Sequence, residues 1–591
     1  MNLSTAPAKR DFWPLLIFAV AVVLRLIALF ELLDAPSFET LVLDARSYDQ
    51  RARQLLAGAP EADLFWQPVL YPCFLAIVYA VSGGSVLLAR LLQACIGGLT
   101  AWATCRLGTL YFGRTTGRIA GLIVAGWAPL MLYELDLVSD GIATIWTPVL
   151  LLLLAKAATA NNWRSPVALG VGAALGVLTR PTYLFFVVLG WLWQVARTPG
   201  AQRRRLALGA MAGWALIWLP AAGASLKLSY RFNPLPFSGG LNLYIGNNPD
   251  PCTTLNVRPG RDWKELETEP VRAGAVLPKE RDAYFQERVK DYALSEPISF
   301  GTGLLSKTIR FVNSRELPRN EDPYSFRSHS RLLAVGMWKV GGWGFPFGLL
   351  LPLAILGAWV RRREVPALLW LFLATYAANV ILVFVSSRYR LAWIPAAALL
   401  AALGGEVLWT HARRRAWPAL VGSIAGVVLL AFAFSRPAEF CEEGVNFDAE
   451  ILRLVGHAQW SDRRFEAAEE SLLRSRGLEL SAETSDYLAR VYLDTGRPLE
   501  ALEMLREAVA LNPNSAEILN NLGLLLGMRG EYAEAERVFA EALALDPANE
   551  AIQRNLALTQ RRLKQLDRHD NNESVSGTAS ERRAVESRAA P

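Results

Sequence analysis

Residues that commonly bind metals are scarce in this sequence. The chain has five cysteines and four histidines among 591 residues. No two of the cysteines have the short spacing of a zinc site, and no histidine has a partner at ligand spacing. The sequence therefore predicts no metal site and no required cofactor, and it leaves the need for a divalent metal undecided.

The chain also lacks the concentrated basic surface of a nucleic-acid-binding protein. Its formal net charge of +7 comes from 61 Lys and Arg against 54 Asp and Glu. These cations occur in short clusters between apolar runs, which is the arrangement that orients a membrane protein. We expect no nucleic-acid partner.

Apolar residues are abundant and grouped into long runs. Hydrophobic residues make up 52% of the chain, more than one soluble core could bury. About eleven runs approach the roughly 20 residues needed to cross a bilayer. They cover residues 12–34, 84–112, 116–135, 141–158, 166–180, 182–196, 206–226, 342–360, 365–386, 391–409 and 417–434. The sequence predicts an all-α polytopic membrane protein, with a break at Thr179-Arg180-Pro181 because proline interrupts helices.

The short loops predict how the chain lies in the membrane. Lys and Arg are concentrated in loops on the side of the N-terminus, for example at 203–205, 361–363 and 413–415, and are sparse in the opposite loops. The positive-inside rule then gives a cytoplasmic N-terminus. An odd number of spans carries the first loop, residues 227–340 and the C-terminal part to the far side. In a bacterium this is a multi-pass protein of the inner membrane with a periplasmic C-terminal part.

Four regions are expected. Residues 1–434 form the membrane domain, and its long loop 227–340 forms an extracytoplasmic lid. Within the lid, 239–249 is expected to be a short strand between two turns, and 279–294 a helix. Residues 435–448 are a linker, and 567–591 are a disordered tail.

Residues 449–566 show a tetratricopeptide repeat (TPR) pattern with a period of about 34. The clearest unit, 515–548, has Gly523, Ala535 and Pro547 at the characteristic positions. The preceding unit repeats the pattern, a degenerate unit lies before it, and 550–566 is expected to be a capping helix. Stacked helix pairs present a concave face that binds peptides. We therefore expect an α-solenoid that binds an acceptor protein or a partner assembly.

Candidate site residues gather on the predicted outer side. Asp44 and Tyr48 lie one helical turn apart, directly after the first span, and the proline-punctuated segment 66–79 resembles an interfacial helix. Other acidic and basic residues lie at the outer ends of later spans: Glu134, Asp136, Asp140, Arg180, Arg388 and Arg390. A glycosyl transfer needs a carboxylate to accept a proton and cations to neutralise a departing phosphate. The chain offers both on one side.

The order of these motifs resembles the GT-C superfamily of integral-membrane glycosyltransferases. This group includes protein O-mannosyltransferases and the lipid A aminoarabinose transferase. The matching motifs are Asp44 with Tyr48, Pro68–Pro72, Tyr133–Asp140, Thr179–Pro181 and Ser387–Leu391. The likeness is greatest to bacterial members that carry TPR repeats.

The resemblance implies an inverting transfer from a polyprenyl-phosphate sugar with Asp44 as general base. Arg388 or Arg390 would hold the phosphate, and the interface helix with Tyr71 would frame the lipid groove. Tyr48, Glu134 and Arg180 are further candidates for substrate binding. Ala45 stands where the family's mannosyltransferases have a second acidic residue, so Asp136 or Asp140 could supply that carboxylate from another loop.

The sequence does not identify the acceptor, and it leaves two alternatives to a polyprenyl-phosphate-dependent transferase. The acceptor could be a lipid-linked glycan or a protein. A glycan ligase or polymerase that uses a diphosphate-linked oligosaccharide would also need the outer arginines. A non-enzymatic transporter or scaffold would work through its TPR array and would not depend on Asp44.

Overall fold

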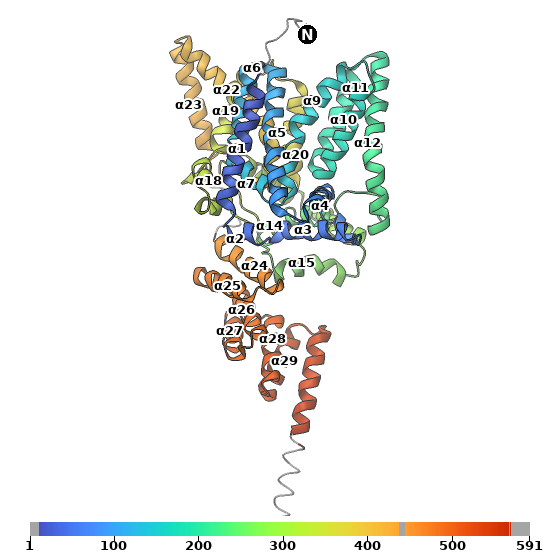
Figure 1. The fold of residues 1–591 in the computed structure, drawn as a ribbon, viewed down its shortest axis with the longest axis vertical. Coiled ribbons are helices and arrows are strands. Elements are labelled where there is room, and N and C mark those ends of the chain that lie inside the picture. The colour runs from blue at the N-terminus through green and yellow to red at the C-terminus, as the bar shows by residue number, and fades with distance from the viewer. Residues whose placement is uncertain (1–10, 437–443, 567, 569–591) are drawn as a thin grey trace, which may run out of the picture. The chain divides into compact units, whose positions relative to one another are not determined.

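The computed structural model describes residues 11–436, 444–566 and 568, and it forms two compact units. Unit 1 comprises Met1–Val445 and unit 2 comprises Asn446–Pro591. Part of the expected linker, at 437–443, and almost all of the expected disordered tail fall outside the described residues. Figure 1 labels the helices of both units.

Unit 1 is built on apolar helices, and α1, α5, α10 and α12 among them run roughly along one direction in Figure 1. These apolar helices are α1 (Trp13–Leu32), α5 (Val86–Phe112), α6 (Arg114–Ala125), α7 (Ala128–Leu135), α8 (Ser139–Ala143), α9 (Trp146–Thr159), α10 (Arg164–Thr179), α11 (Leu184–Arg197), α12 (Gly200–Ser229), α19 (Phe347–Val360), α20 (Ala367–Leu382), α22 (Ile394–Arg413) and α23 (Trp417–Ala433). This is an all-helical multi-pass membrane architecture.

Fewer of the described helices than expected are long enough to cross a bilayer on their own. In the described part of the chain, five helical stretches are long and apolar enough to cross a bilayer: 13–32, 86–112, 139–159, 200–229 and 387–413. The pair α6 and α7, bent by 55°, could form a sixth. Several other apolar helices have only 10–17 residues. The count of eleven therefore stays a prediction.

Breaks in these helices follow local sequence. The run 116–135, which we expected to be one span, bends between α6 and α7 at Gly126 and Trp127, just before a proline at the start of α7. The break predicted near Arg180 is confirmed, because α10 ends at Thr179 and Pro181 begins the short 3-10 helix η2 (Pro181–Tyr183). Proline lacks the amide hydrogen that would continue the helix.

Small residues bring two central helices into close contact. A Cβ on Gly357 of α19 would lie 2.1 Å from the carbonyl oxygen of Leu400, and one on Gly404 of α22 would lie 2.1 Å from that of Leu353. Only glycine allows this backbone approach. The first eleven residues of α22, Ile394–Gly404, are consequently all buried in the core of unit 1.

Short elements surround one end of the bundle. The first loop holds α2 (Pro36–Glu39), α3 (Leu43–Leu56), η1 (Ala62–Phe65) and α4 (Leu70–Ser82). The connection from α20 to α22 holds α21 (Ser387–Arg390) and η4 (Leu391–Trp393). In Figure 1 the labels of α3, α4 and α15 lie near this end of unit 1.

The lid is mainly helical. It contains α13 (Gly239–Ile245), α14 (Pro251–Leu255), α15 (Arg261–Arg272), α16 (Pro278–Ser295), α17 (Pro297–Val312), η3 (Pro323–Ser328) and α18 (Arg331–Gly336). It ends near an antiparallel pair, β1 (Trp338–Val340) and β2 (Trp343–Phe345), in which Trp338 is opposite Phe345. The expected helix at 279–294 is confirmed as α16, whereas the expected strand within 239–249 is wrong and is helix α13.

Unit 2 consists of helix pairs with TPR spacing. The pairs are α24 (Phe447–Ser461) with α25 (Phe465–Leu478), α26 (Ala482–Asp494) with α27 (Pro498–Leu511), and α28 (Ala516–Met528) with α29 (Tyr532–Leu545), followed by a helix over 550–566. A Cβ on Gly523 would lie 2.7 Å from the Phe539 ring, so glycine is needed where the helices of this pair meet. The predicted α-solenoid is confirmed.

Candidate active site

Asp44 lies where two cavities of unit 1 meet. It occupies the first turn of α3, after Val42 in an extended conformation and Leu43 at a positive φ of 53°. The larger cavity has a volume of about 560 Å³ and lies among the first loop, the Arg180 segment, the lid and the α20–α21 connection. The smaller one, of about 30 Å³, shares Asp44, Arg319 and Arg388 with it.

Both oxygens of the Asp44 carboxylate have a hydrogen-bond donor. Arg388 Nη1 lies 2.6 Å from Oδ2, and Gln67 Nε2 donates to Oδ1 at 2.6 Å. The Gln67 amide is itself oriented by Arg51, whose Nη1 donates to Gln67 Oε1 at 2.5 Å. Burial alone would raise the pKa of Asp44, but the charge and hydrogen bond of Arg388 and the hydrogen bond of Gln67 outweigh it and lower the pKa below its ordinary value. Asp44 is thus ionised at neutral pH.

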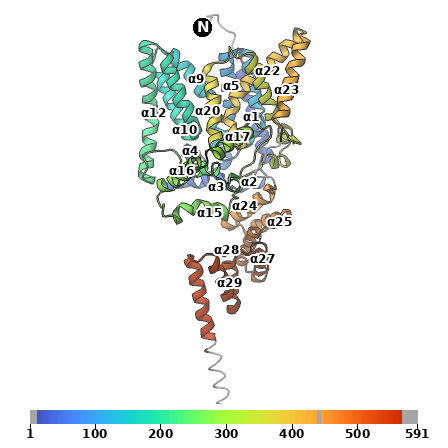
Figure 2. The same cartoon turned by 180° about the vertical axis from the view of Figure 1, so that it is seen from behind.

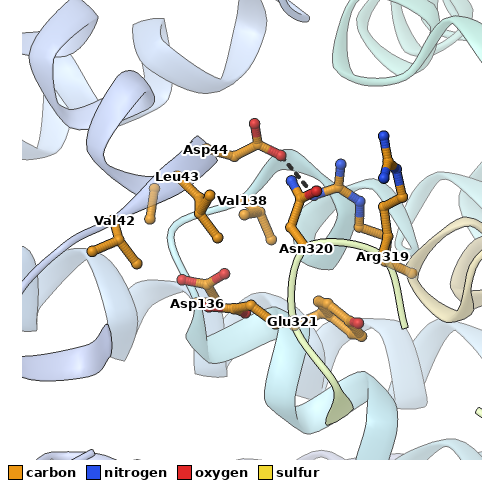
Figure 3. A pocket seen from close by; sticks show the side chains of 11 residues that line it. Val42, Leu43, Asp44, Asp136, Val138, Arg319, Asn320 and Glu321 are labelled. Atoms are coloured by element: carbon orange, nitrogen blue, oxygen red, sulfur yellow. Dashed lines mark hydrogen bonds and ion pairs between the residues drawn. The ribbon is translucent and has the colours of Figure 1, made fainter. Parts of the chain in front are cut away.

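The small cavity brings a second carboxylate close to Asp44. Figure 3 shows Asp136, which follows α7, on the wall of this cavity together with the lid residues Arg319, Asn320 and Glu321. The backbone amide of Leu137 donates to Asp136 Oδ1 at 2.8 Å. Burial raises the pKa of Asp136, and the negative charge of Asp44 raises it further, against the opposing effect of Arg90. Asp44 is therefore the more acidic of the two.

The large cavity contains three further candidates. Asp140 and Arg180 form an ion pair on its wall, and the Arg180 guanidinium lies 4.6 Å from the centre of the Tyr389 ring. Tyr48 also lines this cavity, and its hydroxyl donates to Ser139 Oγ at 3.2 Å. The structure therefore brings Asp44, Tyr48, Asp140, Arg180 and Arg388 together around one space.

Three residues predicted to bind substrate lie outside both cavities. Glu134 is buried and pairs with Arg25 of α1 at 2.5 Å. Arg390 is buried too and donates to the carbonyl oxygens of Asn313 and Arg315, each at 2.7 Å. The Tyr71 hydroxyl is 2.8 Å from Gln93 Oε1, also in the interior. These contacts hold elements of the fold together, and of the two arginines predicted for phosphate binding only Arg388 faces a cavity.

Sequence reasoning missed several residues that line the site. Gln67 precedes Pro68 in the interfacial segment and was read only as part of an amphipathic pattern. Arg319 lines both cavities, donates to the Leu255 carbonyl oxygen at 2.5 Å and lies 5.5 Å from the centre of the Phe384 ring. The only sequence signal for Arg319 was a polar run, 319–322, enclosed by two prolines. Trp66 and Trp263 provide aromatic walls.

The charges around Asp44 suit an anionic ligand. Arg180, Arg319 and Arg388 all line the large cavity, and guanidinium groups are well matched to phosphate oxygens. Within the described ranges, no group of three or more His, Cys, Asp and Glu side chains is placed to hold a metal ion. The site therefore places an ionised carboxylate beside three guanidinium groups.

Family comparisons assign both parts of the chain. A model of the dolichyl-phosphate-mannose-protein mannosyltransferase family matches residues 66–222, and a tetratricopeptide repeat model matches residues 488–568. The chain is thus similar to this mannosyltransferase family over 66–222 and to TPR proteins over 488–568. The first matched segment includes Gln67, Asp136, Asp140 and Arg180, while Asp44 and Arg388 lie outside it.

Solved structures similar to this chain include AglB, ArnT and MamA. The oligosaccharyltransferase AglB from Archaeoglobus fulgidus, in complex with an inhibitory peptide and a dolichol-phosphate, is 14% identical with a TM-score of 0.41, over 77% of this chain and 59% of AglB. ArnT from Cupriavidus metallidurans, bound to undecaprenyl phosphate, is 16% identical with a TM-score of 0.33, over 68% and 80%. MamA is 17% identical with a TM-score of 0.19, over 30% and 91%. No curated protein matches the chain by sequence.

Proposed function

We propose that this protein is a glycosyltransferase that moves a sugar from a polyprenyl-phosphate donor to an extracytoplasmic acceptor, with Asp44 as general base. The acceptor is a lipid-linked glycan or a protein. The observation that carries the proposal is the position of Asp44, an ionised carboxylate that opens on the large cavity and lies 2.6 Å from Arg388.

The site residues support a direct displacement. An acceptor nucleophile in the large cavity would give its proton to Asp44 while its oxygen or nitrogen attacks the anomeric carbon of the sugar. The bond between that carbon and the phosphate oxygen breaks at the same time, and the sugar inverts its configuration. Arg388 and Arg319 would stabilise the negative charge left on the polyprenyl phosphate.

Other residues would position the reactants. Gln67 and Arg51 orient the Asp44 carboxylate through consecutive hydrogen bonds of 2.6 and 2.5 Å. Trp66 and Trp263, on the cavity wall, offer flat apolar surfaces against which a sugar ring can pack. Fixing both reactants against the base supplies much of the rate enhancement in reactions of this kind.

The orientation in the membrane and the role of the repeats belong to the same proposal. The N-terminus would be cytoplasmic, and the site, the lid and the TPR repeats would lie on the far side of the bacterial inner membrane. The repeats would hold an acceptor protein or a partner assembly.

A substitution at Asp44 tests the proposal. Purified full-length protein is incubated with radiolabelled polyprenyl-phosphate sugars and cell-envelope fractions, and Asp44→Asn is compared with the natural sequence. We expect a loss of transfer of about 10²- to 10⁴-fold, the usual contribution of a general base. Unchanged transfer by Asp44→Asn would refute the role of Asp44.

Asp49→Asn is the matched control. Asp49 is one helical turn further along α3, but its carboxylate binds Arg53 and the Tyr79 hydroxyl, each at 2.8 Å, and lines neither cavity. We expect Asp49→Asn to keep most of the transfer activity. If neither protein transfers sugar from any donor, the transporter or scaffold function becomes the better account.

One observation favours a second candidate, a glycan ligase or polymerase that uses a diphosphate-linked donor. Arg180, Arg319 and Arg388 line the same cavity, and three guanidinium groups can serve two phosphates. Competition between polyprenyl phosphate and polyprenyl diphosphate for the labelled donor separates the two. Stronger inhibition by the diphosphate would favour the second candidate.

A further inference from the structure

Helix α17 of the lid buries its lysine and exposes several of its apolar residues. Its lysine, Lys307, is only 6% exposed, whereas Ile298, Leu305 and Ile309 are 82%, 61% and 52% exposed. These three apolar residues are seven and four positions apart, so they form one stripe along the helix. Lys307 lies on the opposite face.

The buried lysine is fully engaged within unit 1. Lys307 Nζ donates to Asn247 Oδ1 at 2.7 Å, to the Gly246 carbonyl oxygen at 3.0 Å and to the Val383 carbonyl oxygen at 3.2 Å. These partners belong to the turn after α13 and to the end of α20. Lys307 therefore fixes the direction of α17, and the apolar stripe has to face outward.

The exposed stripe is unlike a surface that faces water. Between Ile298 and Ile309 the sequence contains one charged residue, Lys307, and it is buried. The other exposed residues of this stretch are small, such as Gly301, Thr302 and Ser306. A continuous apolar stripe of this length indicates contact with lipid or with another protein.

The neighbouring helix identifies lipid as the better occupant. α17 packs against α20, an apolar helix of the membrane bundle that exposes Trp370 and Leu382. Figure 2 shows α17 alongside the bundle. An apolar helix of the bundle thus lies directly beside α17. With 16 residues, α17 is about 24 Å long at 1.5 Å per residue, which is too short to cross the roughly 30 Å hydrocarbon core.

We propose that α17 lies partly embedded in the membrane and contacts lipid acyl chains through Ile298, Leu305 and Ile309. The lid is then anchored to the bilayer. Since α13 lines the large cavity and Lys307 joins the turn after α13 to α17, this anchor also holds the cavity wall in place. The inference uses only the membrane location of unit 1 and is independent of the donor.

Photochemical labelling tests this contact. A diazirine-bearing amino acid replaces Ile298, Leu305 or Ile309, one at a time, in the full-length protein reconstituted in nanodiscs of phosphatidylethanolamine and phosphatidylglycerol. After irradiation, mass spectrometry measures adducts with lipid, water and protein. The same replacement of Lys279, an exposed residue at the start of α16, is the matched control.

We expect lipid adducts to be several-fold more abundant at the three stripe positions than at Lys279, where water adducts should dominate. Water adducts at the stripe would overturn the proposal. Cross-links to a second copy of the chain would overturn it too, by identifying a protein interface. Because three positions are tested separately, one variant that fails to fold does not remove the test.

Discussion

At the scale of single residues, the central feature is the pair of donors on Asp44. Arg388 and Gln67 each hold one carboxylate oxygen at 2.6 Å. Together they lower the pKa of Asp44 against the opposing effect of burial. The Asp44 carboxylate is therefore ionised at neutral pH, and its two neighbours keep it ionised further into acid.

Arg388→Gln should shift the pH dependence of transfer. Because Arg388 lowers the pKa of Asp44, its removal raises that pKa, and the acid limb of kcat/KM moves to higher pH. The KM for the donor should also rise, since the phosphate loses a cation. pH–rate profiles at several donor concentrations measure both effects. Arg53→Gln removes an exposed guanidinium from the same region and should leave the acid limb of kcat/KM in place. An unmoved acid limb in Arg388→Gln would contradict the ion pair between Arg388 and Asp44.

Gln67→Ala should reduce activity without unfolding the protein. It removes one hydrogen bond to an ionised carboxylate, an interaction worth about 1.5–3 kcal/mol. We expect kcat to fall at least about tenfold, with the acid limb shifted upward because Gln67 also lowers the pKa of Asp44. Thermal unfolding in detergent checks that the fold is intact. A fall in activity explained entirely by lower stability would count against a positioning role.

At the scale of elements, the lid rests on close backbone packing. A Cβ on Gly246 would lie 1.9 Å from the Val383 carbonyl oxygen, which also accepts from Lys307. Gly246→Ala should therefore separate the turn after α13 from the end of α20. We expect a lower apparent melting temperature and weaker transfer, both measured on purified protein.

Gly223→Ala is the control for this change. Gly223 lies in α12, and a Cβ there would have no neighbour within 4 Å. Alanine is the better helix former by about 0.5–1 kcal/mol, so this variant should be at least as stable as the natural protein. Equal behaviour of the two variants would show that the Gly246 contact is unimportant.

Regular periodicity made much of the fold predictable, and short segments showed its limit. The TPR pairs and α16 follow repeated apolar spacing over many residues. For 239–249, the turn residues at both ends led us to expect a short strand between two turns. The buried residues are instead Leu241, Tyr244 and Ile245, which is helical spacing. In so short a segment, packing against α16 decides the conformation, and the sequence does not display that packing.

The site was predictable only in part, for a similar reason. Asp44, Tyr48, Asp140, Arg180 and Arg388 stood at the ends of apolar runs, where charged groups are conspicuous. In the fold these residues come together although two of them, Asp44 and Arg388, are 344 positions apart. Spacing along the chain does not reveal such a contact. The sequence did not single out Gln67 and Arg319 in this way. Arg390 lies close to Arg388 in the sequence, but its side chain faces the interior.

At the scale of the whole molecule, the two compact units suggest a division of labour. Deletion of 446–591 should leave unit 1 folded, because each unit has its own hydrophobic core. If the repeats recruit the acceptor, this deletion should retain hydrolysis of the labelled donor and lose transfer to protein. Parallel assays of hydrolysis and transfer measure the two activities. Full transfer by the truncated chain would contradict acceptor recruitment.

The buried ion pair between Arg25 and Glu134 constrains how the protein is made. The two residues are 109 positions apart, and each would cost about 2.5–3.5 kcal/mol if left alone in the middle of a bilayer. The first apolar helix emerges from the ribosome well before its glutamate partner. Arg25 therefore lacks its carboxylate partner until α7 has been synthesised.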